Sequence, residues 1–477
     1  MEAVKNEKSK KKPDLLHGPI WSKIPVFALP VAATAILEQL FNASDIAVVG
    51  NFTGAAKTVA VAAVGANSPI IGLLVNLFVG IALGANVVIA TAIGRNDKET
   101  VQRAVHTAIL MAVIGGVLVS VFGELVAGPL LHALNVPTEV YPYAVLYLRI
   151  YLLGMPVILL YNFEAAIFRS VGETKVPLMA LAISGILNVL LNLFFVIVLK
   201  MTVNGVATAT VLSNAVSAAL LYRKLQKTEL PIQVHFKKLK IDWQSMRKIL
   251  RIGLPAGIQS AMFSVSNIII QSAINSLGKV VMAASSAAFN VEIIAYDVMN
   301  SFSQACTTFV GQNYGAGQID RCKATLKLSL LEAVLATGVT CAIVLLPGRF
   351  WLSVFNNDPQ VIEIGYTRLV MVCLSYIFTV LYEVMSGYLR GFGNSLVPAL
   401  LTMLGVCGVR ILWIQFRFPQ SRTFLTILEA YPISLAVTAL LVLIALLIYR
   451  PANRFEKAQK KSEKTKEAAP GESNYAS

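Results

Sequence analysis

The chain has 477 residues, of which 56% are hydrophobic and only 14% are charged, and its mean hydropathy is +0.69. Because soluble domains carry about 25% charged residues, this composition excludes a soluble protein and predicts an integral membrane protein. The net charge of +15 does not indicate nucleic-acid binding, because Lys and Arg gather at the two ends and in one central segment without aromatic residues between them.

Twelve apolar runs follow one another along the chain, and each approaches the roughly 20 residues that a membrane-spanning helix needs. They cover residues 23–50, 58–87, 103–127, 139–163, 176–199, 204–222, 248–276, 280–310, 324–347, 361–388, 396–416 and 427–449. An even number of spans places both tails on one side of the membrane. Since the basic connecting segments also fall on that side, we expect both termini in the cytoplasm and the protein in the plasma membrane.

The chain contains an internal repeat. Three pairs of segments match in the same order, namely 27–31 with 252–256, Gly94 with Gly315, and 167–177 with 388–398. Because each copy holds an even number of spans, both halves insert the same way up, and the repeat axis lies along the membrane normal. The sequence therefore predicts an all-α polytopic membrane protein with twelve transmembrane helices in two pseudo-symmetric six-helix bundles.

The predicted domains follow from this repeat and from the charged segments. They are a basic cytoplasmic tail at 1–22, an N-terminal bundle at 23–222, a cytoplasmic linker at 223–247, a C-terminal bundle at 248–449, and a basic tail at 450–477 that we expect to be disordered. Two halves around a central cavity are what alternating access requires, because rocking one half against the other exposes the cavity to each side in turn.

The first span carries polar residues on one helical face. Glu38, Asn42 and Asp45 are four and three residues apart, which places them on the same side of a helix. An ionisable group in hydrocarbon costs roughly 2.5–3.5 kcal/mol, so an acid here is expected to face a watery cavity. We interpret Asp45 as a proton or cation site. The alternatives are a protonated acid satisfied by a neighbouring helix and, for Glu38, a side chain that reaches the membrane surface.

Further polar residues in the first-half spans extend this candidate site. One carboxylate among amide and hydroxyl oxygens suits Na⁺ and equally suits a proton-switched hydrogen-bond network. For any single Asn or Thr, helix packing is the alternative role. The candidate coupling site consists of Glu38, Asn42, Asp45, Asn162, Asn188, Asn192 and Thr210.

The second half offers a candidate substrate cavity, because a buried acid among aromatic and Met side chains suits a lipophilic cation. Packing is the alternative role for the aromatic and Met residues. Glu383 has the alternative of pairing with a basic group, since Arg390 lies seven residues further on. The candidate residues are Glu292, Tyr296, Asp297, Met299, Tyr382 and Glu383, together with Tyr161 of the first half.

The sequence lacks the common motifs for catalysis, nucleotide binding and metal binding. It has no GxxxxGK[ST] loop, no HExxH pattern and no CxxC spacing among its five cysteines. We therefore expect no enzymatic activity, no cofactor, and no metal other than a Na⁺ at Asp45. An ion gradient, of H⁺ or Na⁺, is then the expected source of energy.

Several motifs resemble the multidrug and toxic compound extrusion (MATE) family, and in particular its DinF-like branch. They are LP near the start of the first and seventh spans, GRNDKETVQRAV after the second, FRSVGETKVP after the fourth, GQNYGAG after the eighth and LRGFGNSLVP after the tenth. The resemblance covers residues 23–449. It implies a V-shaped fold of two six-helix bundles that exports amphipathic, often cationic compounds against an inward flow of H⁺ or Na⁺.

The resemblance also implies roles for individual residues. The first-helix Asp that forms the cation or proton site in DinF-like members corresponds to Asp45, an Asn of helix five to Asn188, and a Thr of helix six to Thr210. Where some members have Asp four residues after that Asn, this chain has Asn192, and the missing negative charge favours H⁺ over Na⁺. The helix-seven Glu of other members has no counterpart in AMFSVSNIII at 261–270.

We expect a secondary active antiporter that exports amphipathic or cationic organic compounds by alternating access, works as a monomer in the lipid bilayer and binds no nucleic acid. The first alternative is a flippase for a lipid-linked precursor, which a basic cavity would favour. The arginines in the interior of the predicted spans, away from their ends, are Arg149, Arg368 and Arg410. A channel or a non-transporting receptor is a further alternative, and the duplicated architecture argues against it.

Overall fold

The computed structural model describes residues 14–134 and 136–456, and every regular element within them is a helix. Eleven of these helices are long and apolar enough to span a membrane, or twelve when one bent pair counts as a single span. The predicted all-α polytopic architecture is therefore confirmed. The basic residues of the N-terminal tail at 1–13 and most of the C-terminal tail, at 457–477, lie outside the described residues.

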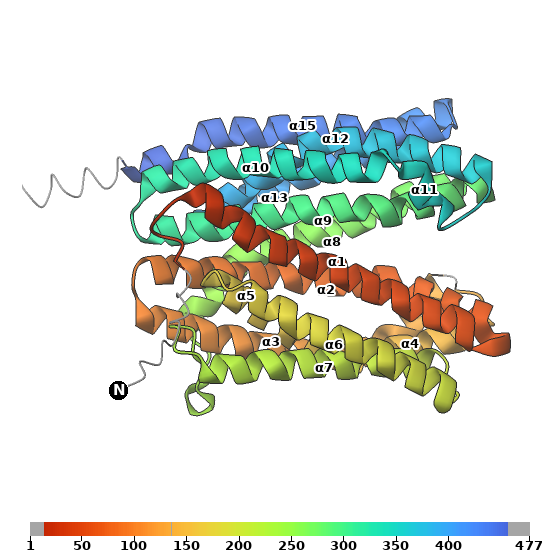
Figure 1. Ribbon diagram of the computed structural model, residues 1–477, viewed down its shortest axis with the longest axis horizontal. Helices are drawn as coiled ribbons and strands as arrows, with labels where there is room; N and C mark the ends of the chain where they lie inside the picture. The colour runs from red at the N-terminus through yellow and green to blue at the C-terminus, as the bar shows by residue number, and fades with distance from the viewer. Residues whose placement is uncertain (1–13, 135, 457–477) are drawn as a thin grey trace, which may run out of the picture.

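The first half begins with a long helix that crosses from one group of helices toward the other (Figure 1). A short 3₁₀ turn, Gly54–Ala56, precedes the second helix, and a π-helical stretch, Phe194–Val198, ends the sixth. The helices are α1 (Ile20–Phe52), α2 (Lys57–Gly94), α3 (Lys98–Ala133), α4 (Tyr141–Leu153), α5 (Met155–Ser170), α6 (Lys175–Leu193) and α7 (Val203–Lys227).

The second half forms the other group in Figure 1. Short 3₁₀ turns lie at Phe236–Lys238 and Phe418–Gln420, and π-helical stretches lie at Met403–Gly408 and Trp413–Arg417. The helices are α8 (Trp243–Asn275), α9 (Lys279–Gly315), α10 (Ile319–Leu345), α11 (Gly348–Ser353), α12 (Pro359–Gly391), α13 (Leu396–Thr402), α14 (Val409–Leu412) and α15 (Phe424–Tyr449).

The fourth predicted span is broken. Residues 139–163 were expected to form one run, but α4 and α5 meet at Gly154 with a bend of 50°. Pro156 lies in the first turn of α5, where its missing N–H is tolerated although it would interrupt a longer helix. Gly154 also lies so close to the Val211 side chain of α7 that a Cβ atom would overlap it.

Two hydrophobic cores meet along α1. Its first turns, including Phe27, are buried against α9, α10 and α12, and the ring centroids of Phe27 and Phe309 are 6.0 Å apart. Its last turns, including Val49, pack in the core of the first half. The helix continues unbroken through Pro30. α1 therefore contacts both halves and links their positions.

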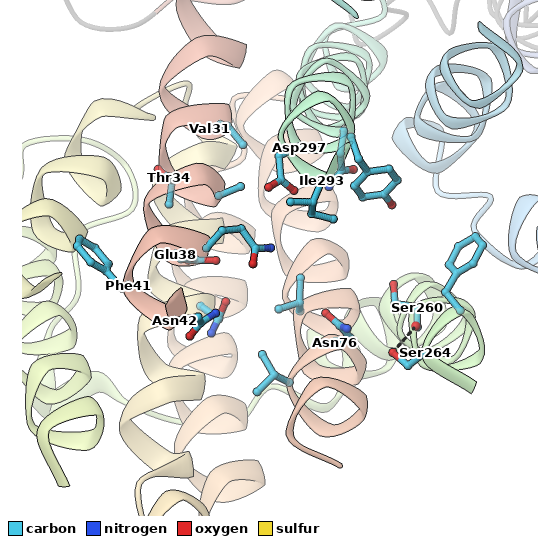
Figure 2. A pocket seen from close by; sticks show the side chains of 18 of the residues that line it. Val31, Thr34, Glu38, Phe41, Asn42, Asn76, Ser260, Ser264, Ile293 and Asp297 are labelled. Atoms are coloured by element: carbon cyan, nitrogen blue, oxygen red, sulfur yellow. Dashed lines mark hydrogen bonds between the residues drawn. The ribbon is translucent and has the colours of Figure 1, made fainter. Parts of the chain in front are cut away.

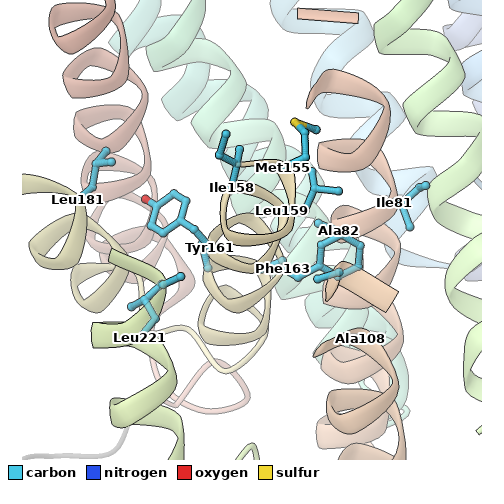
Figure 3. Packing of buried hydrophobic residues seen from close by; sticks show 14 of the residues in the cluster. Ile81, Ala82, Ala108, Met155, Ile158, Leu159, Tyr161, Phe163, Leu181 and Leu221 are labelled. Atoms are coloured by element: carbon cyan, nitrogen blue, oxygen red, sulfur yellow. The ribbon is translucent and has the colours of Figure 1, made fainter. Parts of the chain in front are cut away.

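The core of the first half is built around α5. Figure 3 shows Met155, Leu159 and Phe163 of α5 beside Ala82 of α2 and Ala108 of α3, and these three α5 side chains are fully buried. Because lipid tails are as apolar as these side chains, close packing rather than removal from water holds the helices together. This packing fixes the position of the polar face of α5 relative to the rest of the half.

The two halves pack against each other at the side of the molecule where both ends of the described chain lie (left in Figure 1), here called the termini side. A Cβ atom on Gly80 or Gly84 of α2 would overlap the α8 backbone around Gly257 or Gly253. Small residues of this kind let helix backbones approach closely. The two halves are therefore closed against each other toward the termini side.

The matched turns of the repeat have the same backbone geometry. A Cβ atom on Gly94 would overlap the α9 backbone, and one on Gly315 would overlap the α2 backbone, so the paired glycines lie at the contact between halves. Positive φ angles recur at matched positions, where Gly and Asn are the residues that tolerate them best. They are 56° at Asn96 and 73° at Gly317, and 91° at Gly172 and 81° at Gly393.

The connection between the halves docks on the start of α3. Gln102 Nε2 donates to the Pro231 carbonyl oxygen at 2.7 Å, and Thr107 Oγ1 accepts from the Asp242 backbone N–H at 2.9 Å. Asp242 then caps α8, and hydrogen bonds from the side chain and backbone of Ser245 lower the pKa of the Asp242 carboxyl. These contacts fix where the second half begins relative to the first.

We predict that Gly84→Ala destabilises the protein by roughly 1–3 kcal/mol, because the added methyl group meets backbone atoms of α8 that cannot rotate away. Thermal unfolding of the purified protein should show a lower midpoint. Gly72→Ala is the matched control on the same helix, since nothing lies within 4 Å of its Cβ position. Equal midpoints for Gly84→Ala and the wild type would contradict the close contact between α2 and α8.

Candidate functional site

A cavity of about 590 Å³ lies between the two halves. Figure 2 shows side chains of α1 facing those of α8 and α9 across it. A smaller cavity of about 120 Å³ adjoins it and shares Asn162, Arg169 and Tyr296 as lining residues. The walls of the large cavity come from α1, α2, α4, α5, α6 and α7 of the first half and from α8, α9, α12, α14 and α15 of the second.

Asp45 of α1 lies in a ring of hydrogen bonds with α6 and α7. Asn192 Nδ2 donates to Asp45 Oδ1 at 2.5 Å, and Thr210 Oγ1 donates to Asp45 Oδ2 at 3.0 Å. Asn188 closes the ring, because its Oδ1 accepts from Asn192 at 3.1 Å and its Nδ2 donates to Thr210 at 3.4 Å. Asp45 lines the cavity but is only 5% exposed. The ring therefore holds one buried carboxylate at the cavity wall.

Glu38 and Asn42 lie two turns and one turn before Asp45, respectively, and also line the cavity. Neither side chain has a hydrogen-bond partner among residues 14–134 and 136–456, and both are solvent-accessible. Asp297 of α9 projects from the other half toward the same space (Figure 2), and its Oδ2 is buried without a partner. Two helices of different halves thus present unpaired carboxylates to the same chamber.

Glu292, the other acid predicted for this cavity, is paired. Arg368 Nη2 donates to Glu292 Oε1 at 2.6 Å, and Arg368 Nε donates to Oε2 at 3.1 Å. The third guanidinium nitrogen, Nη1, donates to Ser285 Oγ at 2.7 Å. Both side chains are 4% exposed. This two-point contact neutralises Glu292, so the carboxylate is not free to attract a cationic substrate.

Glu383 lies in the smaller cavity rather than the large one. Its Oε2 is 3.8 Å from Arg390 Nη1, which is the ion pair that its spacing allowed. Arg390 Nη2 also donates to Gln259 Oε1 at 3.1 Å. The matching arginine of the repeat, Arg169, also lines this cavity and donates to Gln304 of the other half at 3.0 Å. Glu383 is therefore paired within its own half, at the wall of the smaller cavity.

The remaining predicted cavity residues divide into two groups. Met299 is wrong as a cavity residue, since it is fully buried among hydrophobic side chains of α1, α10 and α12. Asp297 and Met299 are two residues apart, so they point to opposite sides of α9, and only one can face the cavity. Tyr161, Tyr296 and Tyr382 line the large cavity, as does Asn162 of the predicted coupling site, and their roles in binding stay predictions.

Sequence reasoning missed several polar residues of the wall. Arg169 lies in a predicted turn motif, yet its side chain reaches the cavity, while Asn76 and Gln304 lie within long apolar runs. The pairing of Arg169 with Arg390 across the repeat was the signal that could have found the first of these. Among the described residues, no three His, Cys, Asp or Glu side chains are grouped closely enough to hold a metal ion.

Two halves of membrane-spanning helices around one polar chamber define a membrane transporter of the kind built from internal repeats. The MatE family model matches residues 30–194 and 255–414, which together make up more than half of the chain. The chain therefore belongs to the MatE family of transporters. This is the family that its turn motifs indicated, while its place in the DinF-like branch stays a prediction.

Known relatives match along most of their length. The chain is 26% identical over 436 residues to the probable multidrug resistance protein YoeA of Bacillus subtilis, covering 89% of this chain and 92% of the relative. It is 26% identical over 389 residues to the probable multidrug resistance protein NorM of Thermotoga maritima, covering 80% and 82%. A solved outward-facing structure of a multidrug resistance MATE family transporter has the same fold, with a TM-score of 0.85 at 20% identity and coverage of 94% and 100%.

We predict that Glu292→Gln destabilises the protein by roughly 3–5 kcal/mol, because it leaves the Arg368 guanidinium buried without its counter-ion. The thermal midpoint of the purified protein should fall. Glu363→Gln is the matched control, since it removes the partner of an exposed pair with Arg349, and exposed pairs contribute little. A midpoint for Glu292→Gln as high as that of Glu363→Gln would show that Arg368 finds another partner.

Proposed function

We propose that this protein is a secondary active antiporter that exports amphipathic organic compounds in exchange for H⁺. The observation that carries the proposal is the ring around Asp45, which holds a titratable group at the wall of the chamber between the halves. The names of YoeA and NorM as multidrug resistance proteins support export of organic compounds. An imposed pH gradient should then drive the transport.

The ring suits a group that exchanges a proton. When Asp45 is ionised, it accepts hydrogen bonds from Asn192 and Thr210. When Asp45 is protonated, it has a proton to donate, and Asn192 Oδ1 is a buried acceptor without a partner. A turn of the Asn192 amide would direct that oxygen to the acid. Because both protonation states can be satisfied, and because Asn192 adds no second negative charge, we favour H⁺ over Na⁺ as the coupling ion.

Coupling follows from the position of α1 between the halves. Neutralising Asp45 removes the cost of burying a charge, so protonation favours arrangements in which α1 is more deeply enclosed. The start of α1 packs on the second half and its end on the first. A movement of α1 therefore changes packing contacts in both halves. The proton and the exported compound then bias the same two-state equilibrium in opposite directions.

We propose that the termini side is cytoplasmic, as the basic connecting segments predict. The glycine contacts between α2 and α8 close the halves against each other toward that side. This arrangement is then an outward-facing state in which the chamber exchanges with the outside. A proton that enters from outside reaches Asp45 through the chamber, and the exported compound leaves the same way.

A flippase for a lipid-linked precursor is the second candidate, because arginines line the large cavity. These arginines do not make the large cavity uniformly basic, because four carboxylates line it as well. We therefore prefer the antiporter. A channel is disfavoured, because it needs no closure between halves at the termini side. The charged lining residues are Arg169, Arg368 and Arg410, and Glu38, Asp45, Glu292 and Asp297.

We predict that Asp45→Asn reduces efflux of a lipophilic dye driven by a pH gradient by roughly 5–150-fold, the usual range of coupling between two sites. The dye should still bind, because the chamber remains. Proteoliposomes with an imposed pH gradient give the efflux rate, and fluorescence polarisation gives the binding.

Glu139→Gln is the control, since it removes an exposed acid that does not line the chamber. It should transport as the wild type does. Unchanged gradient-driven efflux in Asp45→Asn would remove Asp45 from the coupling mechanism, and loss of both efflux and dye binding would point to a structural role instead.

A further inference from the structure

The second half presents an unpaired arginine to the large cavity. Arg410 of α14 lines that cavity and is 7% exposed. Its Nε donates to Ser434 Oγ of α15 at 3.1 Å. Within residues 14–134 and 136–456, its two Nη groups have no hydrogen-bond partner and no carboxylate lies within 4.0 Å. The two Nη groups are therefore available to a molecule in the chamber.

The guanidinium is held in a fixed plane. Its Cζ lies 4.4 Å from the centroid of the Tyr431 ring, and the Ser434 hydroxyl holds its Nε from the same helix. Stacking on an aromatic face and a single hydrogen bond at Nε leave the Nη pair pointing outward as a preformed fork. A fork of this kind matches the two oxygens of a carboxylate or a phosphate.

Among the described residues, neither Glu292 nor Asp297, the two acids of this half that line the large cavity, pairs with Arg410. Glu292 is bound at two points by Arg368, whose own Cζ lies 5.5 Å from the same Tyr431 ring. Two guanidinium groups thus lie near one aromatic ring, and the acid pairs with only one of them. A buried charge without a counter-ion is costly, so an anion that binds beside Arg410 would stabilise this arrangement.

The repeat places Arg410 where the first half has its coupling ring. α7 begins at Val203 and α15 at Phe424, which are 221 residues apart, as are Thr210 and Tyr431. Asn188 is 11 residues after Pro177, whereas Arg410 is 12 residues after Pro398. The π-helical stretch Met403–Gly408 accounts for the extra residue, since each π-helical turn holds one more residue than an α-helical turn.

We propose that Arg410, stacked on Tyr431, forms an anion subsite that binds the carboxylate or phosphate group of the exported compound. The opposite half presents the unpaired carboxylate of Glu38 to the cavity, and Asp297 of α9 adds a second unpaired carboxylate from the same half as Arg410. The chamber therefore favours amphipathic compounds with an anionic and a cationic group at opposite ends over simple lipophilic cations. This inference rests on the proposed export function and specifies its substrate class.

The test compares two dyes that share one ring system and differ at one group. Rhodamine 110 carries a free carboxylate, and rhodamine 123 is its methyl ester. Binding of each dye to the purified full chain in lipid-free detergent is followed by fluorescence polarisation. We expect Arg410→Gln to weaken rhodamine 110 binding about tenfold, which corresponds to about 1.4 kcal/mol, and to change rhodamine 123 binding less than about twofold.

Two substitutions of Tyr431 distinguish loss of the anion subsite from loss of the fold, and a third variant serves as a charge control. Tyr431→Phe keeps the ring and should bind both dyes as the wild type does, whereas Tyr431→Leu should lose the preference for rhodamine 110. Arg149→Gln is the matched charge control, since Arg149 pairs with Glu124 and does not line the cavity. It should leave both affinities unchanged.

Equal weakening of both dyes by Arg410→Gln, or an unchanged affinity for rhodamine 110, would overturn the proposal. Phosphatidylglycerol that competes with rhodamine 110 in the wild type but not in Arg410→Gln, while phosphatidylcholine does not, would support the anion subsite and assign its occupant to a lipid headgroup. The assay needs no ion gradient, and Asp45→Asn should change the affinities for the two dyes by the same factor. A failure of the coupling mechanism would therefore leave this test intact.

Discussion

The contact on which the rest of the structure depends is the bond between one carboxylate and its donors from two other helices. Asp45 lies on a helix that is otherwise apolar over much of its length, and Asn192 and Thr210 hold it at the edge of the chamber. A charge in that place is costly. It is tolerable because amide and hydroxyl groups donate to it and because the cavity admits water. Because the cost of the buried charge and the hydrogen bonds to it oppose each other, Asp45 can bind and release a proton.

The repeat gives the two halves the same framework but opposite polarity. The counterpart of Asp45 in the second half, at the offset of the matched LP segments, is the buried Ile270, and the positions that correspond to Asn188 and Thr210 hold Arg410 and Tyr431. The first half thus has a carboxylate with its hydrogen-bond donors, while the second half has an arginine stacked on an aromatic ring. Because the helices of the two halves correspond while their polar residues differ, one half can bind the ion and the other can bind part of the exported compound.

Much of the fold could be predicted from the sequence, because hydropathy and the internal repeat act over long segments. The twelve spans and the matched turns follow from such patterns. The break at Gly154 could not be predicted so readily, since it depends on the close approach of Val211 from a helix distant in sequence. The π-helical stretches around Arg410 were also missed, because apolar runs have no periodic signal for one extra residue.

The polar site was predictable in part for a similar reason. Spacing on one helix identified the shared face of Glu38, Asn42 and Asp45, but spacing alone does not reveal partners on other helices. Glu292 looked like a free acid in the sequence, and the structure pairs it with Arg368. For Glu383 the sequence left pairing with a basic group open, and the structure places its carboxylate beside Arg390. Met299 was misplaced because a run of aromatic and Met residues does not show which side of the helix faces the cavity. Its position two residues from Asp297 shows that it points to the opposite side.

The central claim is that the exported compound and a proton compete through Asp45. The most direct measurement is proton release when a lipophilic dye binds to the purified protein in weakly buffered detergent, followed with a pH indicator. The account predicts release of protons on binding to the wild type and none on binding to Asp45→Asn. Dye binding that releases no proton at any pH at which the protein is folded, or that releases Na⁺ instead, would contradict it.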